Sequence, residues 1–180
     1  MTAFKPKQDM IMSAVEKIEQ AGVDLRELRN VLGCFATGVA VVTTVGDGGK
    51  PVGMTINSFS SVSLDPPLIL WSISLKAPSY NAFATHPAFA VNIMGEECKD
   101  LSLNFARPSE DKFKDVDWRP GEYDVPVLKS ALATLECEMD SKIASGDHEI
   151  FIGRVIRIDQ TEGAPLIFHR GGFASLGSEV

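Results

Sequence analysis

The sequence predicts a mainly β protein whose strands form a closed antiparallel barrel. Short runs rich in β-branched and aromatic residues recur at close spacing along most of the 180 residues, and turn residues separate them. Few segments are long enough for extended helices. The glycine pattern GxGxxG, which marks a parallel dinucleotide-binding fold, is absent. Together these observations are typical of an antiparallel barrel.

Composition and charge narrow the class of protein. The length suits one main domain, and 44% of the residues are hydrophobic, so the chain can bury a core. No apolar run reaches the roughly 18 to 20 residues that span a bilayer, so we expect a soluble protein with no membrane partner. A net charge of −7 without a basic run disfavours nucleic acid. Three widely spaced cysteines and no secretory signal indicate a reducing cytoplasm.

The first part of the chain predicts two helices. Residues 9–20 carry apolar residues near helical spacing. A second helix is expected to begin at Asp24, a good N-cap, and to run until Gly38. Its apolar stripe consists of Leu25, Leu28, Leu32 and Phe35. We therefore divide the chain into a helical extension, 1–23, and a barrel domain, 24–180.

The rest of the chain alternates strands with turns. A β-branched run and a second strand flank an Asp-Gly turn, as in a hairpin. We expect strands or extended chain over 39–45, 51–55, 56–64, 68–74, 89–93, 131–143, 149–159, 165–168 and 173–176. Short helices are expected over 79–85 and 96–105, and a polar loop over 107–126. A bulge is expected in 149–159 because its apolar alternation is imperfect.

The most unusual stretch is Thr55–Ser63, where hydroxyl or amide side chains occur on both faces of an expected strand. Each unpaired buried polar group would cost about 1–3 kcal/mol, so this run needs partners or solvent. Three interpretations remain open: an exposed edge strand, a polar turn that satisfies itself, or a strand and loop that bind a ligand. A ligand rich in donors, acceptors and phosphate oxygens would suit such residues.

Two further segments are weak signals when taken alone. Gly146-Asp147-His148-Glu149 reads as a turn that opens a strand, and 165–173 places two aromatic residues, a histidine and an arginine around a double glycine. The three histidines, His86, His148 and His169, lie far apart and form no metal-binding pair, so we predict no metal site. GxSxG is absent, which disfavours hydrolysis by a serine nucleophile.

Taken as a set, three motifs become specific. GMTINSFSSVSLDPPL over 53–68, GDH over 146–148 and the segment 165–173 resemble the short-chain flavin reductases of two-component flavin-dependent monooxygenases. The resemblance runs from about Asn30 to Leu176. It implies an antiparallel Greek-key split β-barrel with short flanking helices, as a homodimer. It also implies an oxidoreductase that oxidises NADH or NADPH and supplies reduced FMN or FAD to a separate monooxygenase.

The resemblance also implies which residues form the site. The expected cofactor-binding residues are Thr55, Ile56, Asn57, Ser58, Ser60, Ser61, Ser72, Ser74, Ser79, Phe105 and Ala106. Asn104 belongs to the same segment as the last two. The expected NAD(P)H-binding residues are His148, Arg170 and Phe173, with His148 positioning the nicotinamide. The family often has tyrosine where this chain has Phe168 and Phe173, which leaves stacking as their expected contribution.

Two rival functions stay open at this point. A flavin-binding electron carrier or sensor on the same barrel would hold its flavin tightly and turn over no free flavin. A barrel dimer without catalytic activity would leave the polar stretch as an exposed edge. The sequence does not decide between FMN and FAD or between NADH and NADPH.

Overall fold

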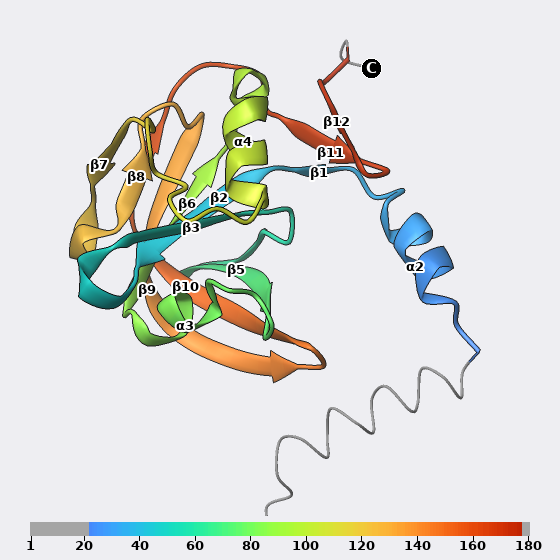
Figure 1. Cartoon of the computed structure of the whole chain (residues 1–180), viewed down its shortest axis with the longest axis horizontal. Helices are drawn as coiled ribbons and strands as arrows, with labels where there is room; N and C mark the ends of the chain where they lie inside the picture. The colour runs from blue at the N-terminus through green and yellow to red at the C-terminus, as the bar shows by residue number, and fades with distance from the viewer. Residues whose placement is uncertain (1–21, 178–180) are drawn as a thin grey trace, which may run out of the picture.

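One seven-stranded antiparallel sheet forms the body of the molecule (Figure 1). The computed structural model describes residues 22–177, so the helix expected over 9–20 lies outside the described residues. In chain order, the strands of this sheet are β2 (Ala40–Val45), β3 (Pro51–Ile56), β4 (Ser60–Leu64), β5 (Pro67–Ser74), β6 (Ala88–Ile93), β9 (Ala133–Ser145) and β10 (His148–Gln160). Their order across the sheet is β3-β2-β6-β9-β10-β5-β4.

The two edge strands of this sheet are neighbours along the chain. Only residues 57–59 join β3 to β4, and an extended chain covers at most about 3.3–3.6 Å per residue. The sheet must therefore curl until its two edges approach each other. Since β3 and β4 do not pair, the barrel stays open along this line, and the expected split barrel is confirmed. The polar stretch is two strands with a break at 57–59, not one continuous strand.

Aromatic residues fill the barrel interior. Trp71 on β5 is fully buried and makes edge-on contacts with Phe83, Phe89 and Phe151, with ring centroids 4.9–5.6 Å apart. Along β5 every second side chain is buried, as expected for a strand with one face on the core. The expected bulge in β10 is confirmed by two register shifts against β9.

Helices cover the outside of the barrel near β3. α4 (Lys99–Ala106) packs on β3 and follows the 3₁₀ turn η2 (Glu96–Cys98), so the predicted 96–105 helix has two parts. α3 (Tyr80–Thr85) follows β5 and buries Phe83. A 3₁₀ turn, η1 (Asp47–Gly49), closes the β2–β3 hairpin at the predicted Asp-Gly turn.

The second predicted helix exists but is shorter than expected. α2 (Leu25–Leu32) begins at Asp24, whose carboxylate accepts the N–H groups of Arg26 and Glu27. It ends at Gly33 instead of Gly38 because β1 (Thr37–Gly38) needs extended backbone to pair with β11 (Ile167–His169). β12 (Gly172–Ala174) completes that small sheet. Phe35 consequently lies outside the helix and is 78% exposed.

The segment predicted as a loop over 107–126 contains further structure. β7 (Trp118–Pro120) pairs with β8 (Pro126–Leu128) across the 3₁₀ turn η3 (Glu122–Asp124). The buried carboxylate of Glu136 accepts the Glu122 N–H at 2.5 Å and pairs with Arg119 at 3.3 Å. These contacts come from a residue distant in sequence, so the local pattern could not predict this hairpin. Among the helices within 22–177, none combines the length and apolar character that a bilayer crossing requires.

Candidate functional site

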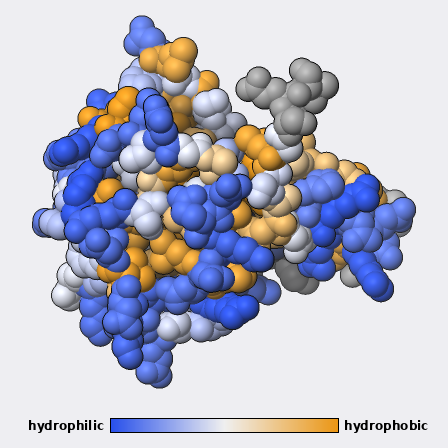
Figure 2. Space-filling model, turned by 90° about the horizontal axis from the view of Figure 1, so that it is seen from above, coloured by the Kyte–Doolittle hydropathy of each residue, from blue (hydrophilic) through white to orange (hydrophobic). Residues whose placement is uncertain are grey.

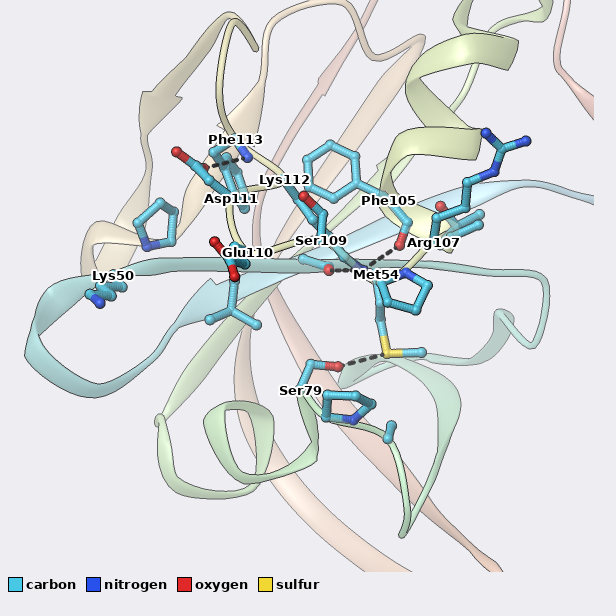
Figure 3. Close-up of a pocket in the computed structure, with 18 residues that line it drawn as sticks. Lys50, Met54, Ser79, Phe105, Arg107, Ser109, Glu110, Asp111, Lys112 and Phe113 are labelled. Carbon is cyan, nitrogen blue, oxygen red and sulfur yellow. Dashed lines mark hydrogen bonds between the residues drawn. The ribbon is translucent and has the colours of Figure 1, made fainter.

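A cavity of about 840 Å³ lies along the open edge of β3 (Figure 3). This volume falls within the roughly 300–1,000 Å³ of small-molecule sites. Three chain segments line the cavity: residues 50–55 along β3, residues 77–79 before α3, and residues 105–113 at the end of α4 and in the following loop. The cavity therefore lies on the side of β3 where the barrel is split.

β3 contributes side chains from both of its faces. Val52 and Met54 turn toward the barrel core, where they pack against buried residues. On the opposite face, the Thr55 hydroxyl donates to the Ser102 carbonyl at 2.6 Å, which ties β3 to α4. Gly53 lies under Phe105, and a Cβ at this position would stand 2.7 Å from the Phe105 ring. The absence of a side chain at Gly53 therefore allows α4 to lie close to β3.

The loop after α4 is held in place by specific hydrogen bonds. The Asp111 carboxylate accepts the N–H groups of Phe113 and Lys114 at 3.0 and 3.1 Å. The Asn104 amide donates to the Lys112 carbonyl at 2.7 Å. The Lys112 ammonium donates to the carbonyls of Phe105 and Gly53 at 2.7 and 3.3 Å, and Figure 3 draws both bonds.

Cations gather around this cavity although the chain is acidic. Lys50, Arg107 and Lys112 line it together with Glu110 and Asp111. Lys112 is half-buried, and this loss of solvent lowers its pKa below the usual lysine range. A partly desolvated ammonium favours an anionic neighbour. The cavity thus combines apolar walls from Met54 and Phe105 with donors for an anion.

Four of the predicted site residues meet at this cavity. Thr55, Ser79, Phe105 and Ala106 line it, although they lie up to about fifty positions apart in the sequence. Ser79 Oγ lies 3.3 Å from the Met54 sulfur across the cavity wall. Figure 3 shows Ser79 and Met54 pointing toward each other below β3. Asn104 does not line the cavity but holds the loop that does.

Other predicted cofactor residues lie at the split, outside the cavity lining. Ser58 Oγ donates to the Ser72 carbonyl and accepts the Ser72 N–H, both at 3.1 Å. These two bonds connect the segment 57–59 to β5. Ser74 Oγ accepts the Lys76 N–H. The Ile56 side chain belongs to the barrel core, which leaves only its backbone for a ligand. The exposed residues of this group are Asn57, Ser60 and Ser61.

These hydroxyls bear on the three interpretations of the polar stretch. β4 is an exposed edge strand, as the first interpretation holds, and Ser58 satisfies itself within the fold, as the second holds. Of the stretch Thr55–Ser63, the ligand-binding interpretation still applies to Thr55, which lines the cavity. The stretch therefore has features of the first two interpretations, and ligand binding stays a prediction for the part that borders the cavity.

His148 lies at the tip of the β9–β10 hairpin. Its register partner on β5 is Ser74, another predicted site residue. His148 Nδ1 lies 2.7 Å from Asp147 Oδ1, and this bond holds the pKa of Asp147 below its usual range. Since an ionised carboxylate only accepts, Nδ1 carries the proton. The Leu75 N–H donates to the Asp147 carbonyl at 3.0 Å, which connects this tip to the segment that forms the 77–79 wall.

Arg170 and Phe173 lie apart from His148 within one chain. They belong to the β11–β12 hairpin, which Figure 1 shows in red at the upper right, well away from the orange tip of β9 and β10 at the bottom. The Arg170 guanidinium donates to the Cys34 sulfur at 3.6 Å, and Phe173 packs edge-on against Phe168 at 5.7 Å. The three residues expected to bind NAD(P)H therefore do not come together within the described chain.

The sequence pattern does not identify the polar residues that follow α4 as part of the site. Arg107, Ser109 and Lys112 line the cavity, whereas the pattern predicts only a polar loop there. The signal that points to them is their position directly after Phe105-Ala106, a pair that the family resemblance places at the site. Within residues 22–177, no three His, Cys, Asp or Glu side chains gather as metal ligands would.

Comparison with known proteins places these features in one family. The model of the "Flavin reductase like domain" family matches residues 32–177. The reductase component of the flavin-dependent trigonelline monooxygenase of Acinetobacter baylyi is 44% identical over 162 residues, which are 90% of this chain and 50% of that protein. The FMN reductase (NADH) SmoA of Agrobacterium fabrum is 42% identical over 152 residues, 84% of this chain and 86% of that protein.

A solved structure agrees with these relatives. The Streptomyces globisporus NADH:FAD oxidoreductase SgcE6, in complex with NAD and FAD fragments, superposes with a TM-score of 0.81 at 38% identity, over 86% of this chain and 93% of that one. The chain spans about half the length of the first two curated relatives, 48% and 50%. Since the family match covers most of the chain, the chain belongs to the flavin reductase-like domain family.

Proposed function

We propose that this protein is an NAD(P)H:flavin oxidoreductase that reduces FMN or FAD and supplies the reduced flavin to a separate monooxygenase. The observation that carries the proposal is the cavity at the open edge of β3, where Thr55, Ser79, Phe105 and Ala106 converge. The names of the relatives support the same activity, because they include an FMN reductase (NADH) and monooxygenase reductase components.

The residues at the cavity fit a flavin. Met54, which is only partly buried, supplies apolar contact for a flat ring, and Phe105 supports the cavity wall from behind. Lys50, Arg107 and Lys112 offset the charge of phosphate groups. As an edge strand, β3 carries backbone N–H and C=O groups that the sheet leaves unpaired, and these suit the polar edge of a flavin. Bound there, the flavin supplies a hydride acceptor that no side chain of this protein offers.

His148 has the role of orienting the nicotinamide. Because Asp147 accepts the Nδ1 proton, this hydrogen bond fixes the orientation of the imidazole ring. The protein's task is then to hold two flat rings at near-attack distance, roughly 3–3.5 Å. Such positioning needs a fixed imidazole rather than a general base.

We further propose a homodimer in the cytoplasm. Large apolar side chains stay exposed on α2 and β4, notably Val31 (63%), Leu32 (63%) and Leu64 (94%). α2 buries none of its residues, and Figure 2 shows it as part of an arm that stands out from the body. A second copy would cover these residues and could bring its own Arg170 and Phe173 toward His148. The free thiols of Cys34, Cys98 and Cys137 suit a reducing compartment.

The activity is tested by following NADH and NADPH oxidation at 340 nm with and without added FMN or FAD. We expect turnover that depends on added flavin and follows saturation kinetics in it. A protein that holds its flavin tightly through purification and shows no free-flavin turnover would be the electron carrier instead. Absence of turnover with all four combinations would refute the reductase proposal.

A further inference from the structure

Lys112 is the one cavity-lining cation whose ammonium is fixed by two hydrogen bonds within the described residues. It donates to the carbonyls of Phe105 and Gly53 at 2.7 and 3.3 Å. The first is at the C-terminal end of α4 and the second is on β3. The ammonium therefore has a defined position between the two elements that form the cavity, unlike an exposed lysine on a flexible stem.

This ammonium has donor capacity and charge left over. A lysine has three N–H donors, and the hydrogen bonds of Lys112 within residues 22–177 occupy two. Within residues 22–177, Lys112 forms no ion pair: each carboxylate that lies within 4.0 Å of a cation there pairs with a different residue. The neighbouring Asp111 carboxylate accepts the backbone N–H groups of residues 113 and 114.

A half-buried cation without a counter-ion is unfavourable in a folded chain unless something compensates for it. Two neutral carbonyls recover part of the lost hydration, yet burial still lowers the pKa of Lys112. The carbonyl at the C-terminal end of α4 also favours a cation, but these two bonds leave one N–H of the ammonium for a further acceptor. An anionic group in the cavity beside Lys112 would supply that acceptor and compensate the lost hydration.

We infer that Lys112 is a positioning residue for the flavin, whose remaining N–H donates to an anionic oxygen of the bound flavin. This inference rests on the proposed function and assigns a role to one residue of that site. Two groups share the required chemistry: the terminal phosphate, and the ring oxygens that gain negative charge on reduction. The test separates these two sources.

The key variant is Lys112→Gln, because its amide retains two donors for the carbonyls of Phe105 and Gly53 but carries no charge. Lys112→Arg keeps the charge, and Lys114→Gln is the matched control on the same loop, since Lys114 is exposed and does not line the cavity. Dissociation constants of FMN and riboflavin, each oxidised and chemically reduced, are measured by fluorescence and absorbance titration.

If phosphate is the partner, K112Q weakens FMN about tenfold to a hundredfold and leaves riboflavin unchanged, as expected for loss of a charged hydrogen bond. If the ring is the partner, K112Q weakens both reduced flavins more than the oxidised ones and lowers the midpoint potential of the bound flavin. K112R should recover most of the loss, and K114Q should equal the wild type.

Unchanged FMN-to-riboflavin and reduced-to-oxidised affinity ratios in K112Q would overturn the inference, even if the variant melts at a lower temperature. Should K112Q fail to fold, the wild type and K112R still test the inference. Equal wild-type affinities for FMN and riboflavin, in both oxidation states, would overturn the inference. Tighter binding of FMN than of riboflavin, or of reduced than of oxidised flavin, in both the wild type and K112R would support it. If the wild type binds no flavin at all, the proposed function itself has failed.

Discussion

Replacing Gly53 with alanine tests the close approach of α4 to β3. The added Cβ would lie 2.7 and 2.9 Å from two atoms of the Phe105 ring. That ring is fully buried and packs edge-on against Phe113 with centroids 5.0 Å apart, so it has little room to move. Overpacking of a buried site costs about 1–3 kcal/mol, while replacing glycine with alanine recovers about 0.4–1 kcal/mol of unfolded-state entropy.

The net destabilisation of Gly53→Ala is therefore about 1.3 kcal/mol, the midpoint of a range of about 0–2.6 kcal/mol. For a chain of this size that lowers the melting temperature by roughly 2–8 °C. Displacement of Phe105 also disturbs the cavity wall, so FMN affinity should fall in the same variant. Thermal unfolding followed by circular dichroism measures the first effect, and fluorescence titration with FMN measures the second.

Gly38→Ala is the matched control. A Cβ at Gly38 meets no atom within 4 Å, and this glycine also lies in a strand. We expect this variant to melt at or slightly above the wild-type temperature. If Gly53→Ala behaved like Gly38→Ala, the reasoning about the β3–α4 contact would be refuted.

Three further predictions concern His148, Asp147 and Tyr80. His148→Ala should raise the KM for NADH more than the KM for flavin in steady-state assays, and an unchanged nicotinamide KM would count against its role. The folded-state pKa of Asp147 lies below its usual value of 3.8. Its ionised carboxylate therefore stabilises the fold fully at a pH above 3.8, and this contribution is lost as the pH falls through the lowered pKa. Urea unfolding between pH 5 and 3 should therefore show a steeper loss for the wild type than for Asp147→Asn; parallel curves would contradict this. Tyr80→Phe removes the hydroxyl that donates to the buried Glu149 carboxylate at 2.8 Å, and should lower the free energy of unfolding by about 1–3 kcal/mol, whereas an unchanged value would mean that water replaces the hydroxyl.

Local sequence patterns predicted the barrel strands well because those strands alternate or run apolar against a single core. The hairpin around Gly46–Lys50 and the bulged β10 are examples. The β7–β8 hairpin was missed because its support, the buried Glu136 carboxylate, comes from β9. The end of α2 was misplaced because β1 competes for the same residues, which is a tertiary effect.

The candidate site was only partly predictable from the sequence. The motif over 53–68 and the family resemblance that it carries predicted Thr55 as a site residue and a split barrel as the fold. The same resemblance predicted Phe105 and Ala106. The pattern could not reveal that Ser58 uses its hydroxyl on the Ser72 backbone, since that bond depends on how the sheet curls. Nor could it identify Lys112, whose importance appears only when the loop folds back onto β3.

The location of the flavin is the central claim and is tested most directly by a crystal structure of the protein grown with FMN. We predict that the isoalloxazine lies along the open edge of β3, between residues 77–79 and the 105–113 segment, with one ring face accessible from the direction of His148. FMN bound elsewhere on the molecule, or a ring sealed off from His148 in the complete assembly, would contradict the account.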